Sequence, residues 1–468
     1  MPFLDRIQRW AAERPHQPAV VIGGVRVTWS ELRDGATARL AATGPVTALC
    51  QENSADFVLN YAAAVAGERQ CAVLDPAWSA GLRATISQHI AADAVPGSAG
   101  ADDALTDGPG GSTFLIGLTS GTTSVPKAFT RSRRSWQTSF DASIEFFGLE
   151  PNDVTLAPGP LAASLNLYAL SECLYAGAEF QTLTTFDVGD VHAAITYDRV
   201  TRLVLVPTML RMLSERGIAG GVDAAGIRTI ICAGSKLDAR TLQAARRWAP
   251  NATIFEYYGA SELSFVSGTG LPASAPLELG GTGIGKPFPG VDVRIIDDAG
   301  EPLADGIPGN ISVRSPMVSN GYLWGDDGEA LRQFGDWYTV GDQGFLHDGE
   351  LHILGRRADM ILTAGKNVYP HEVELALAAV PGVGSAIAAG MPDDIRGQRV
   401  VAGIVPAHGA LTATQIKAGL EDLLPRDKRP LQYYLLAELP TTDRGKVSRG
   451  LLLDWIAAND KRVRSLGS

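Results

Sequence analysis

Short apolar runs alternate with helical patterns along the first half of the chain. The runs are rich in Val, Ile, Leu and aromatic residues and lie at residues 18–22, 46–50, 71–75, 203–208, 229–232 and 252–259. Apolar residues recur at helical spacing in 56–67, which ends at a glycine, and in 241–250. Strands that alternate with helices are typical of βαβ units. The pattern therefore predicts an α/β fold with parallel sheets.

The pattern changes after about residue 285. Residues 291–303, 310–315 and 344–356 alternate apolar and polar side chains, and in the last run Asp348-Gly349 stands between two halves. An Asp-Gly pair in that setting indicates a β-hairpin. From Asp359 onward a mixed pattern of helices and strands resumes, which indicates a second domain.

Composition and charge exclude several classes of protein. Of the 468 residues, 45% are hydrophobic and 19% charged, as in folded globular proteins. The 40 basic and 51 acidic residues give a net charge of −11, which argues against nucleic acid or an anionic membrane as the main partner. The N-terminal stretch is an amphipathic helix pattern without the apolar core of a signal peptide or a membrane span. The four scattered cysteines indicate free thiols in a reducing compartment, so we expect a cytoplasmic protein.

The stretch LTSGTTSVPK, residues 118–127, carries five hydroxyl residues and one glycine ahead of a proline and a lysine. It follows a buried-strand run, TFLIG, and so lies at the edge of an α/β sheet where ligands usually bind. The groups that could hold a polyphosphate are the backbone around Gly121, the hydroxyls of Thr119, Ser120, Thr122 and Thr123, and the Lys127 ammonium. Pro126 excludes a Walker loop, which needs glycine at that position. A surface turn rich in Ser and Thr is the alternative.

The stretch resembles the signature loop of the adenylate-forming superfamily, which includes acyl-CoA synthetases, stand-alone adenylation domains and firefly luciferase. Further motifs of that superfamily have counterparts in the same order, at 257–262 (YYGASE), 337–342 (WYTVGD), 355–374 and 440–449 (PTTDRGKVSR). The resemblance implies a large N-terminal domain, residues 1–355, of parallel βαβ sheets with a small β-barrel-like subdomain. A small, mobile α+β domain, residues 356–468, would follow.

The resemblance also implies which residues form the site. Those for ATP or AMP are Thr119, Ser120, Gly121, Thr122, Thr123, Lys127, Ala233, Gly234, Ser235, Tyr257, Tyr258, Gly259, Ser261, Glu262, Asp342, Arg356 and Lys446. Among these, Thr119, Glu262 and Lys446 would be catalytic, and Glu262 would be a hard oxygen ligand for Mg²⁺. Tyr258 would stack on adenine, and Asp342, at an exposed edge, would hold the ribose hydroxyls. The acyl pocket would include Ala163, Ser164, Ala233 and Gly234, with Gly365 in the thiol tunnel and Ala358 at the hinge.

Two further stretches look like functional motifs, and we interpret both as structural. Residues 280–287, GGTGIGKP, nearly match a Walker loop, but the two prolines Pro287 and Pro289 prevent the helix that would bind phosphate. Residues 140–143, FDAS, look like the amino-group motif of amino-acid adenylation domains. They lie in a helical pattern soon after the phosphate loop, earlier than that motif belongs. We therefore do not expect an α-amino acid substrate.

The implied activity is ATP-dependent, AMP-forming activation of a carboxylic acid, followed by transfer of the acyl group to a thiol. The cofactors would be ATP, Mg²⁺ and coenzyme A, or instead the phosphopantetheine of an acyl carrier protein. An ATP-binding protein without ligase activity is a further alternative, and a phosphohydrolase, which releases phosphate rather than pyrophosphate, is another. Residues 159–170 are small and apolar and contain no cation, which favours an uncharged aliphatic or aromatic acid. The oligomeric state is left open.

Overall fold

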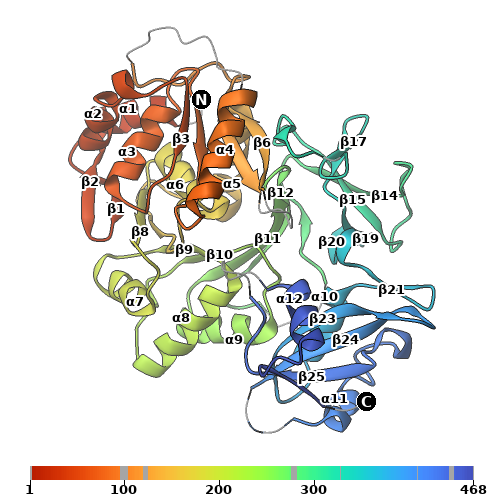
Figure 1. The fold of residues 1–468 in the computed structure, drawn as a ribbon. Helices are drawn as coiled ribbons and strands as arrows, with labels where there is room; N and C mark the ends of the chain where they lie inside the picture. The colour runs from red at the N-terminus through yellow and green to blue at the C-terminus, as the bar shows by residue number, and fades with distance from the viewer. Residues whose placement is uncertain are drawn as a thin grey trace. The chain divides into compact units, whose positions relative to one another are not determined.

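The computed structural model describes residues 3–94, 104–119, 125–275, 282–326, 328–407, 409, 411–441 and 447–466. The chain divides into two compact units (Figure 1). The first consists of Met1–Leu277, Ile284–Val293 and Ser312–Val340, and the second of Glu278–Gly283, Arg294–Ile311 and Gly341–Ser468. The predicted domain boundary between residues 355 and 356 stays a prediction.

The largest sheet of the first unit has nine strands. Their order is β13 (Lys286–Pro287), β12 (Ser264–Leu271), β11 (Thr253–Ala260), β10 (Thr229–Cys232), β9 (Arg202–Leu205), β7 (Val154–Leu156), β8 (Glu179–Thr182), β1 (Pro18–Ile22) and β2 (Val25–Thr28). The strands from β11 to β1 in this order pair in parallel, and the outer pairs are antiparallel. The parallel βαβ arrangement predicted from the sequence is confirmed, and β1 and β10 have the predicted bounds.

Helices α7 (Val188–Tyr197), α8 (Pro207–Gly220) and α9 (Ala239–Trp248) pack against this sheet through apolar side chains of one core. Side chains cap two of them: Asp187 accepts the backbone N–H of Asp190, and Asp238 accepts that of Thr241. Such caps satisfy N–H groups that the first turn leaves without partners. The other helices of this unit are α1 (Leu4–Glu13), α2 (Trp29–Thr37), α3 (Ala55–Ala64), α4 (Ala80–Asp93), α5 (Arg133–Phe147) and α6 (Ser164–Ala176).

A second sheet of the first unit has five strands and supports the predicted phosphate loop. Its order is β16 (Tyr322–Trp324), β6 (Lys127–Ser132), β5 (Thr113–Thr119), β4 (Gln70–Val73) and β3 (Val46–Leu49). Strands β3, β4 and β5 are parallel, whereas β6 and β16 add in the antiparallel sense. Ile86 and Ile90 of α4 pack with Ala72 and Ile116 of this sheet. A short hairpin, β17 (Arg332–Phe334) and β18 (Trp337–Thr339), also belongs to this unit.

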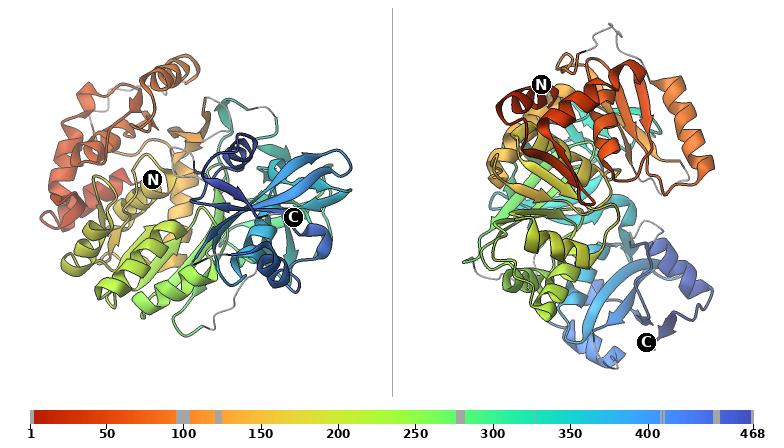
Figure 2. Two further views of the ribbon diagram at one scale, coloured as in Figure 1. Left: turned by 60° about the horizontal axis from the view of Figure 1, so that its bottom comes forward. Right: turned by 90° about the vertical axis from the view of Figure 1, so that its left-hand side faces the viewer.

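The second unit contains a sheet with helices on both faces (Figure 2). Its strands are β22 (Lys366–Val368), β21 (Ile361–Thr363), β24 (Gly397–Pro406), β25 (Gln432–Leu436) and β26 (Val463–Ser465), with β23 (Val383–Asp393) paired to β24. Successive residues Ile387 and Ala388 belong to different cores, because side chains alternate across a strand. Helices α10 (Pro370–Ala378) and α11 (Ala413–Gly419) pack into one core, and α12 (Arg449–Ala457) packs into the other.

The antiparallel pattern predicted after residue 285 is confirmed. In the second unit, β19 (Asp342–His347) and β20 (Glu350–Arg356) form the predicted hairpin, and Gly309 and Asn310 of β15 (Gly309–Arg314) pair with β19. Strand β14 (Asp292–Ile296) pairs with β15. At the hairpin turn, Asp348 and Gly349 both have positive φ, 50° and 77°, as a two-residue turn of this type requires. None of the helices in the described part of the chain is long and apolar enough to cross a membrane.

Candidate active site

The two arms of the predicted phosphate loop end opposite each other. Thr119 is the last residue of β5, Lys127 is the first of β6, and the two are paired across the antiparallel ladder. The residues between the arms that we predicted to bind phosphate, Ser120, Gly121, Thr122 and Thr123, lie outside the described residues. The arms therefore fix where the loop leaves and re-enters the sheet.

The predicted metal ligand, Glu262, follows β11 in a turn together with Ser261. Glu262 is only 8% exposed, and Tyr322 donates its phenolic hydrogen to the carboxylate oxygen Oε1. Burial, together with the Glu262 charge, raises the pKa of Tyr322, so the phenol is protonated and acts as the donor. Tyr322 is also paired with Phe129 of β6, the strand that continues the other arm of the phosphate loop. Tyr322 thus connects one arm of the phosphate loop to Glu262.

Gly259 is needed because of a close backbone approach at this turn. A Cβ atom there would lie 2.2 Å from the carbonyl oxygen of Ser264, on the neighbouring strand β12. Its neighbours Tyr257 and Tyr258 project to opposite faces of β11, as successive strand residues do. Tyr257 packs between the rings of Phe147 and Phe265, with centroids 5.8 and 4.8 Å away. Tyr257 thus packs among aromatic rings and is only partly buried, and Tyr258 lies on the opposite face of the strand.

The predicted Ala233–Ser235 turn lies at the same sheet edge as the Glu262 turn. It follows β10, which runs parallel to β11, and the carboxyl ends of parallel strands share one edge. Gly234 has a φ of 94°, which other residues rarely adopt. Lys236, the residue after this turn, forms an ion pair with Glu256 at 2.6 Å. Glu256 also accepts the backbone N–H of Leu237. The pair anchors the end of the turn to β11.

The predicted acyl-pocket residues Ala163 and Ser164 lie at the start of α6, where Ala163 is the N-cap residue. The loop before them is held by Asn53, which is buried and comes from a distant part of the chain. Its side chain donates to the Gly159 carbonyl (3.0 Å) and accepts the Leu161 backbone N–H (2.7 Å). The loop is therefore fixed by hydrogen bonds rather than by packing alone.

The remaining predicted site residues belong to the second unit. Asp342 and Arg356 are paired across β19 and β20, with Nε of Arg356 3.5 Å from Oδ1 of Asp342. The expectation of an exposed Asp342 is wrong: its side chain is 11% exposed, because its strand, β19, lies inside a sheet between two other strands. Ala358 lies in a 3-10 turn (Arg357–Asp359), and Gly365 lies between β21 and β22 with a φ of 75°. Lys446 lies outside the described residues.

The residues around Glu262 fit a bound divalent cation and triphosphate. In the described part of the chain, no lysine or arginine forms a direct ion pair with this mostly buried carboxylate, and the buried Arg131 guanidinium lies close enough to interact with its charge. Ser319 Oγ, whose backbone N–H donates to the Glu262 carbonyl, is buried without a hydrogen-bond partner in the described residues. A buried hydroxyl without a partner is costly unless a ligand satisfies it.

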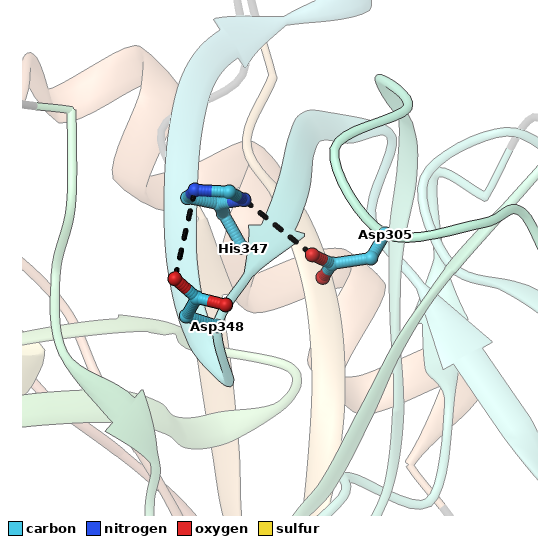
Figure 3. A group of neighbouring side chains, drawn as sticks. All are labelled: Asp305, His347 and Asp348. Atoms are coloured by element: carbon cyan, nitrogen blue, oxygen red, sulfur yellow. Dashed lines mark ion pairs between the residues drawn. The ribbon is translucent and has the colours of Figure 1, made fainter.

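A separate group of possible metal ligands lies on the second unit (Figure 3). The two ring nitrogens of His347 face two carboxylates, Asp305 at 3.4 Å and Asp348 at 3.8 Å. All three side chains are exposed. We assign no metal to them, because exposed ion pairs of this kind are common and contribute little.

The described residues of both stretches that we interpreted as structural, 282–287 and 140–143, agree with that interpretation, and residues 280–281 lie outside the described residues. Residues 286–287 form the short strand β13, and the predicted turn into a strand is followed by β14 rather than by a helix. Residues 140–143 lie inside α5, where Phe140 and Ser143 are buried and Asp141 accepts the hydroxyl of Tyr175 at 2.7 Å. One detail was not predicted: strand β6 separates the phosphate loop from this helix.

Three residues of the site escaped the sequence analysis: Asn53, Arg131 and Tyr322. Arg131 lies in β6, KAFTRS, and its guanidinium donates to the carbonyl of Ser261, next to Glu262. Tyr322 follows a glycine at the start of a short aromatic run, GYLW. A lone arginine facing the core is a usable signal, because such a group must find buried acceptors. Asn53 gives no comparable signal, since asparagine is common in loops.

Comparison with known proteins identifies the family. The model of the AMP-binding enzyme family matches residues 98–323, and that of the AMP-binding enzyme C-terminal domain matches residues 372–446. The chain is 33% identical to the uncharacterized acyl–CoA ligase YhfT of Bacillus subtilis over 344 residues, 73% of this chain and 68% of that protein. It is 33% identical to the indoleacetate–CoA ligase of Aromatoleum aromaticum over 343 residues, 72% of this chain and 66% of that protein.

The fold is also that of solved adenylate-forming enzymes. The o-succinylbenzoate CoA synthetase MenE of Bacillus subtilis, solved with its acyl-adenylate, superimposes with a TM-score of 0.82 at 24% identity and covers 99% of both chains. At that identity the likeness concerns the fold alone. Together with the motifs and the family models, it confirms the predicted α/β class with a large N-terminal and a smaller C-terminal domain. The chain belongs to the adenylate-forming AMP-binding enzymes and is an AMP-forming acid–thiol ligase.

Proposed function

We propose that this enzyme activates an uncharged aliphatic or aromatic carboxylic acid with ATP and Mg²⁺ and transfers the acyl group to coenzyme A. The observation that carries the proposal is the connection from β6, one arm of the phosphate loop, through Tyr322 to the buried Glu262 carboxylate. It links an arm of a phosphate loop to a buried carboxylate, as metal-assisted attack on a triphosphate requires.

The first step joins the acid to AMP. A carboxylate oxygen of the acid attacks the α-phosphorus of ATP, a P–O bond forms, and the bond to the bridging oxygen breaks so that pyrophosphate leaves. Lys127, Lys446 and the Thr119 hydroxyl would stabilise charge on the phosphoryl oxygens. Glu262 would hold Mg²⁺, which supplies further charge neutralisation there. Asp342 and Arg356 would bind the ribose, and Tyr258 the adenine.

The second step makes the thioester. The thiol sulfur attacks the acyl carbon, its proton passes to solvent, and the C–O bond to AMP breaks. Gly365, in its tight turn, would line the path of the thiol, and Ala358 would be the hinge between the steps. An acyl carrier protein presents the same pantetheine thiol and is the alternative acceptor.

Two observations support an uncharged acid. Residues 159–170 contain no Lys, Arg or His, and Asn53 holds part of this loop. The cation that follows the Ala233–Ser235 turn, Lys236, is neutralised by Glu256 at 2.6 Å. A second carboxylate on the substrate would therefore lack a partner there. We also propose the cytoplasm as the location, supported by four free cysteines.

A panel of acids tests the proposal. Pyrophosphate release is measured with monocarboxylic aliphatic acids of increasing length, aromatic acids, dicarboxylic acids and α-amino acids, each with and without coenzyme A or a phosphopantetheinylated carrier protein. We expect turnover with an uncharged monocarboxylic acid that requires coenzyme A. Phosphate release without an acid would favour a phosphohydrolase. Nucleotide binding with no turnover on any acid would favour an ATP-binding protein without ligase activity.

A further inference from the structure

A distant segment, residues 317–324, runs along β6 next to the phosphate loop. Asn320 donates its backbone N–H to the Thr130 carbonyl at 2.9 Å, and Thr130 donates to the Gly321 carbonyl at 3.0 Å. Past this point the segment becomes strand β16, and the indole N–H of Trp324 donates to the Pro126 carbonyl at 2.9 Å. The segment is therefore tied to the arm of the phosphate loop that enters β6.

The same segment also holds the backbone of the Glu262 turn. Ser319 donates its N–H to the Glu262 carbonyl at 2.7 Å. The buried guanidinium of Arg131 donates to the carbonyls of Met317 and Ser261, the latter at 2.5 Å. Burial lowers the pKa of Arg131 to about 10, which still leaves it charged at neutral pH. Arg131 thus joins the segment to the turn from the core side.

The Tyr322 phenol completes this arrangement at the side-chain level. Its hydroxyl donates to Oε1 of Glu262, while its ring meets that of Phe129 edge-on, with centroids 6.4 Å apart. The hydrogen bond occupies one carboxylate oxygen and leaves Oε2 as the oxygen for another ligand. The ring packing and this hydrogen bond together restrict the direction in which Oε2 points.

We propose that Tyr322 is a positioning residue of the magnesium site, which acts by holding the Glu262 carboxylate in the orientation that binds the metal next to the triphosphate. The inference rests on the proposed function, in which Glu262 is the metal ligand. Groups that hydrogen bond to metal ligands typically change metal affinity by about 10–100-fold when they are removed. Tyr322 should therefore affect the metal and leave the binding of metal-free nucleotide unchanged.

The test measures how strongly Mg²⁺ tightens nucleotide binding, so it does not depend on activity. The affinity for α,β-methylene-ATP is determined by calorimetry with excess Mg²⁺ and with EDTA, and the ratio gives the effect of the metal. The variants are Tyr322→Phe, Glu262→Gln and the double variant. Tyr175→Phe is the matched control, because Tyr175 also donates to a carboxylate, Asp141, but on the surface. Phenylalanine keeps the ring contact with Phe129, and a thermal melt of each variant checks the fold.

We expect Tyr322→Phe to reduce the Mg²⁺ effect about 10-fold or more, with unchanged affinity in EDTA. Tyr175→Phe should behave as wild type. In the Glu262→Gln background, adding Tyr322→Phe should change nothing further, because Tyr322 acts through that carboxylate. A Tyr322→Phe variant that matches the control, or an effect that adds fully to that of Glu262→Gln, overturns the inference while the proposed function stands. If Glu262→Gln itself keeps the wild-type Mg²⁺ effect, the assignment of the metal ligand fails and the inference fails with it.

Discussion

Asp342 is a mostly buried carboxylate close to an arginine. Its side chain is mostly buried at the start of β19 and faces Arg356 across the hairpin. An asparagine has the same shape but cannot form charge-assisted hydrogen bonds with the two ribose hydroxyls. We expect Asp342→Asn to weaken ATP binding by about 3 kcal/mol, roughly a hundredfold, in calorimetry. The control is Asp298→Asn, whose carboxylate pairs with Arg357 on the surface of the same unit. Equal ATP affinity in the two variants would remove Asp342 from the site.

The cysteines give a second prediction at the residue scale. Cys71, Cys173 and Cys232 are buried, whereas Cys50 is partly exposed. Burial raises the pKa of all three buried thiols, that of Cys173 to about 12, so their reactive thiolate is scarce at pH 8. Ellman's reagent at pH 8 should modify one thiol rapidly in the native protein and all four in denaturant. Rapid modification of two or more native thiols would contradict this packing.

At the scale of elements, α6 and β9 are joined by a buried ion pair. Glu172 and Arg202 lie 2.6 Å apart with side chains 2% exposed, and Ser143 also donates to Glu172 at 2.6 Å. Removing one partner leaves the other charge buried without compensation, which typically costs 3–5 kcal/mol.

Urea denaturation of three variants checks this pair. We expect Glu172→Leu and Arg202→Leu each to lower the free energy of unfolding by about 3–5 kcal/mol. The double variant should lose much less than the sum of the two, because neither charge then remains. Additive losses would show that the two side chains stabilise the fold independently.

Elements were predicted better than the contacts between them. The strands at 18–22 and 229–232 were predicted with the correct bounds, because a strand that is buried on both faces carries apolar side chains at consecutive positions. The pairing of β16 with β6 joins residues almost two hundred apart in the chain, and no local pattern records it. Tyr322 was missed for that reason: its role depends on which carboxylate the fold brings to it.

For the molecule as a whole, the motifs predicted the family and the fold class, and the family models and solved structures confirm both. The predicted site divides between the two compact units, with the phosphate arms and Glu262 in one and Asp342, Arg356 and Gly365 in the other. Lys446 lies in a part of the second unit outside the described residues. Its proposed role therefore still rests on the motif at 440–449 and on the chemistry of the reaction.

The most direct test of the two half-reactions is whether Lys446 acts in the first of them only. If the lysine acts only while the acid is joined to AMP, Lys446→Ala should lose acyl-adenylate formation by a factor on the order of 10²–10³, as expected for the loss of one charge-stabilising group. The same variant should convert supplied acyl-adenylate and coenzyme A to thioester at nearly the wild-type rate. The measurement is a pair of single-turnover assays, one started with ATP and acid and the other with synthetic acyl-adenylate. A large loss in the first assay alone is the result that the account predicts, and an equal loss in both, or none in either, would contradict it.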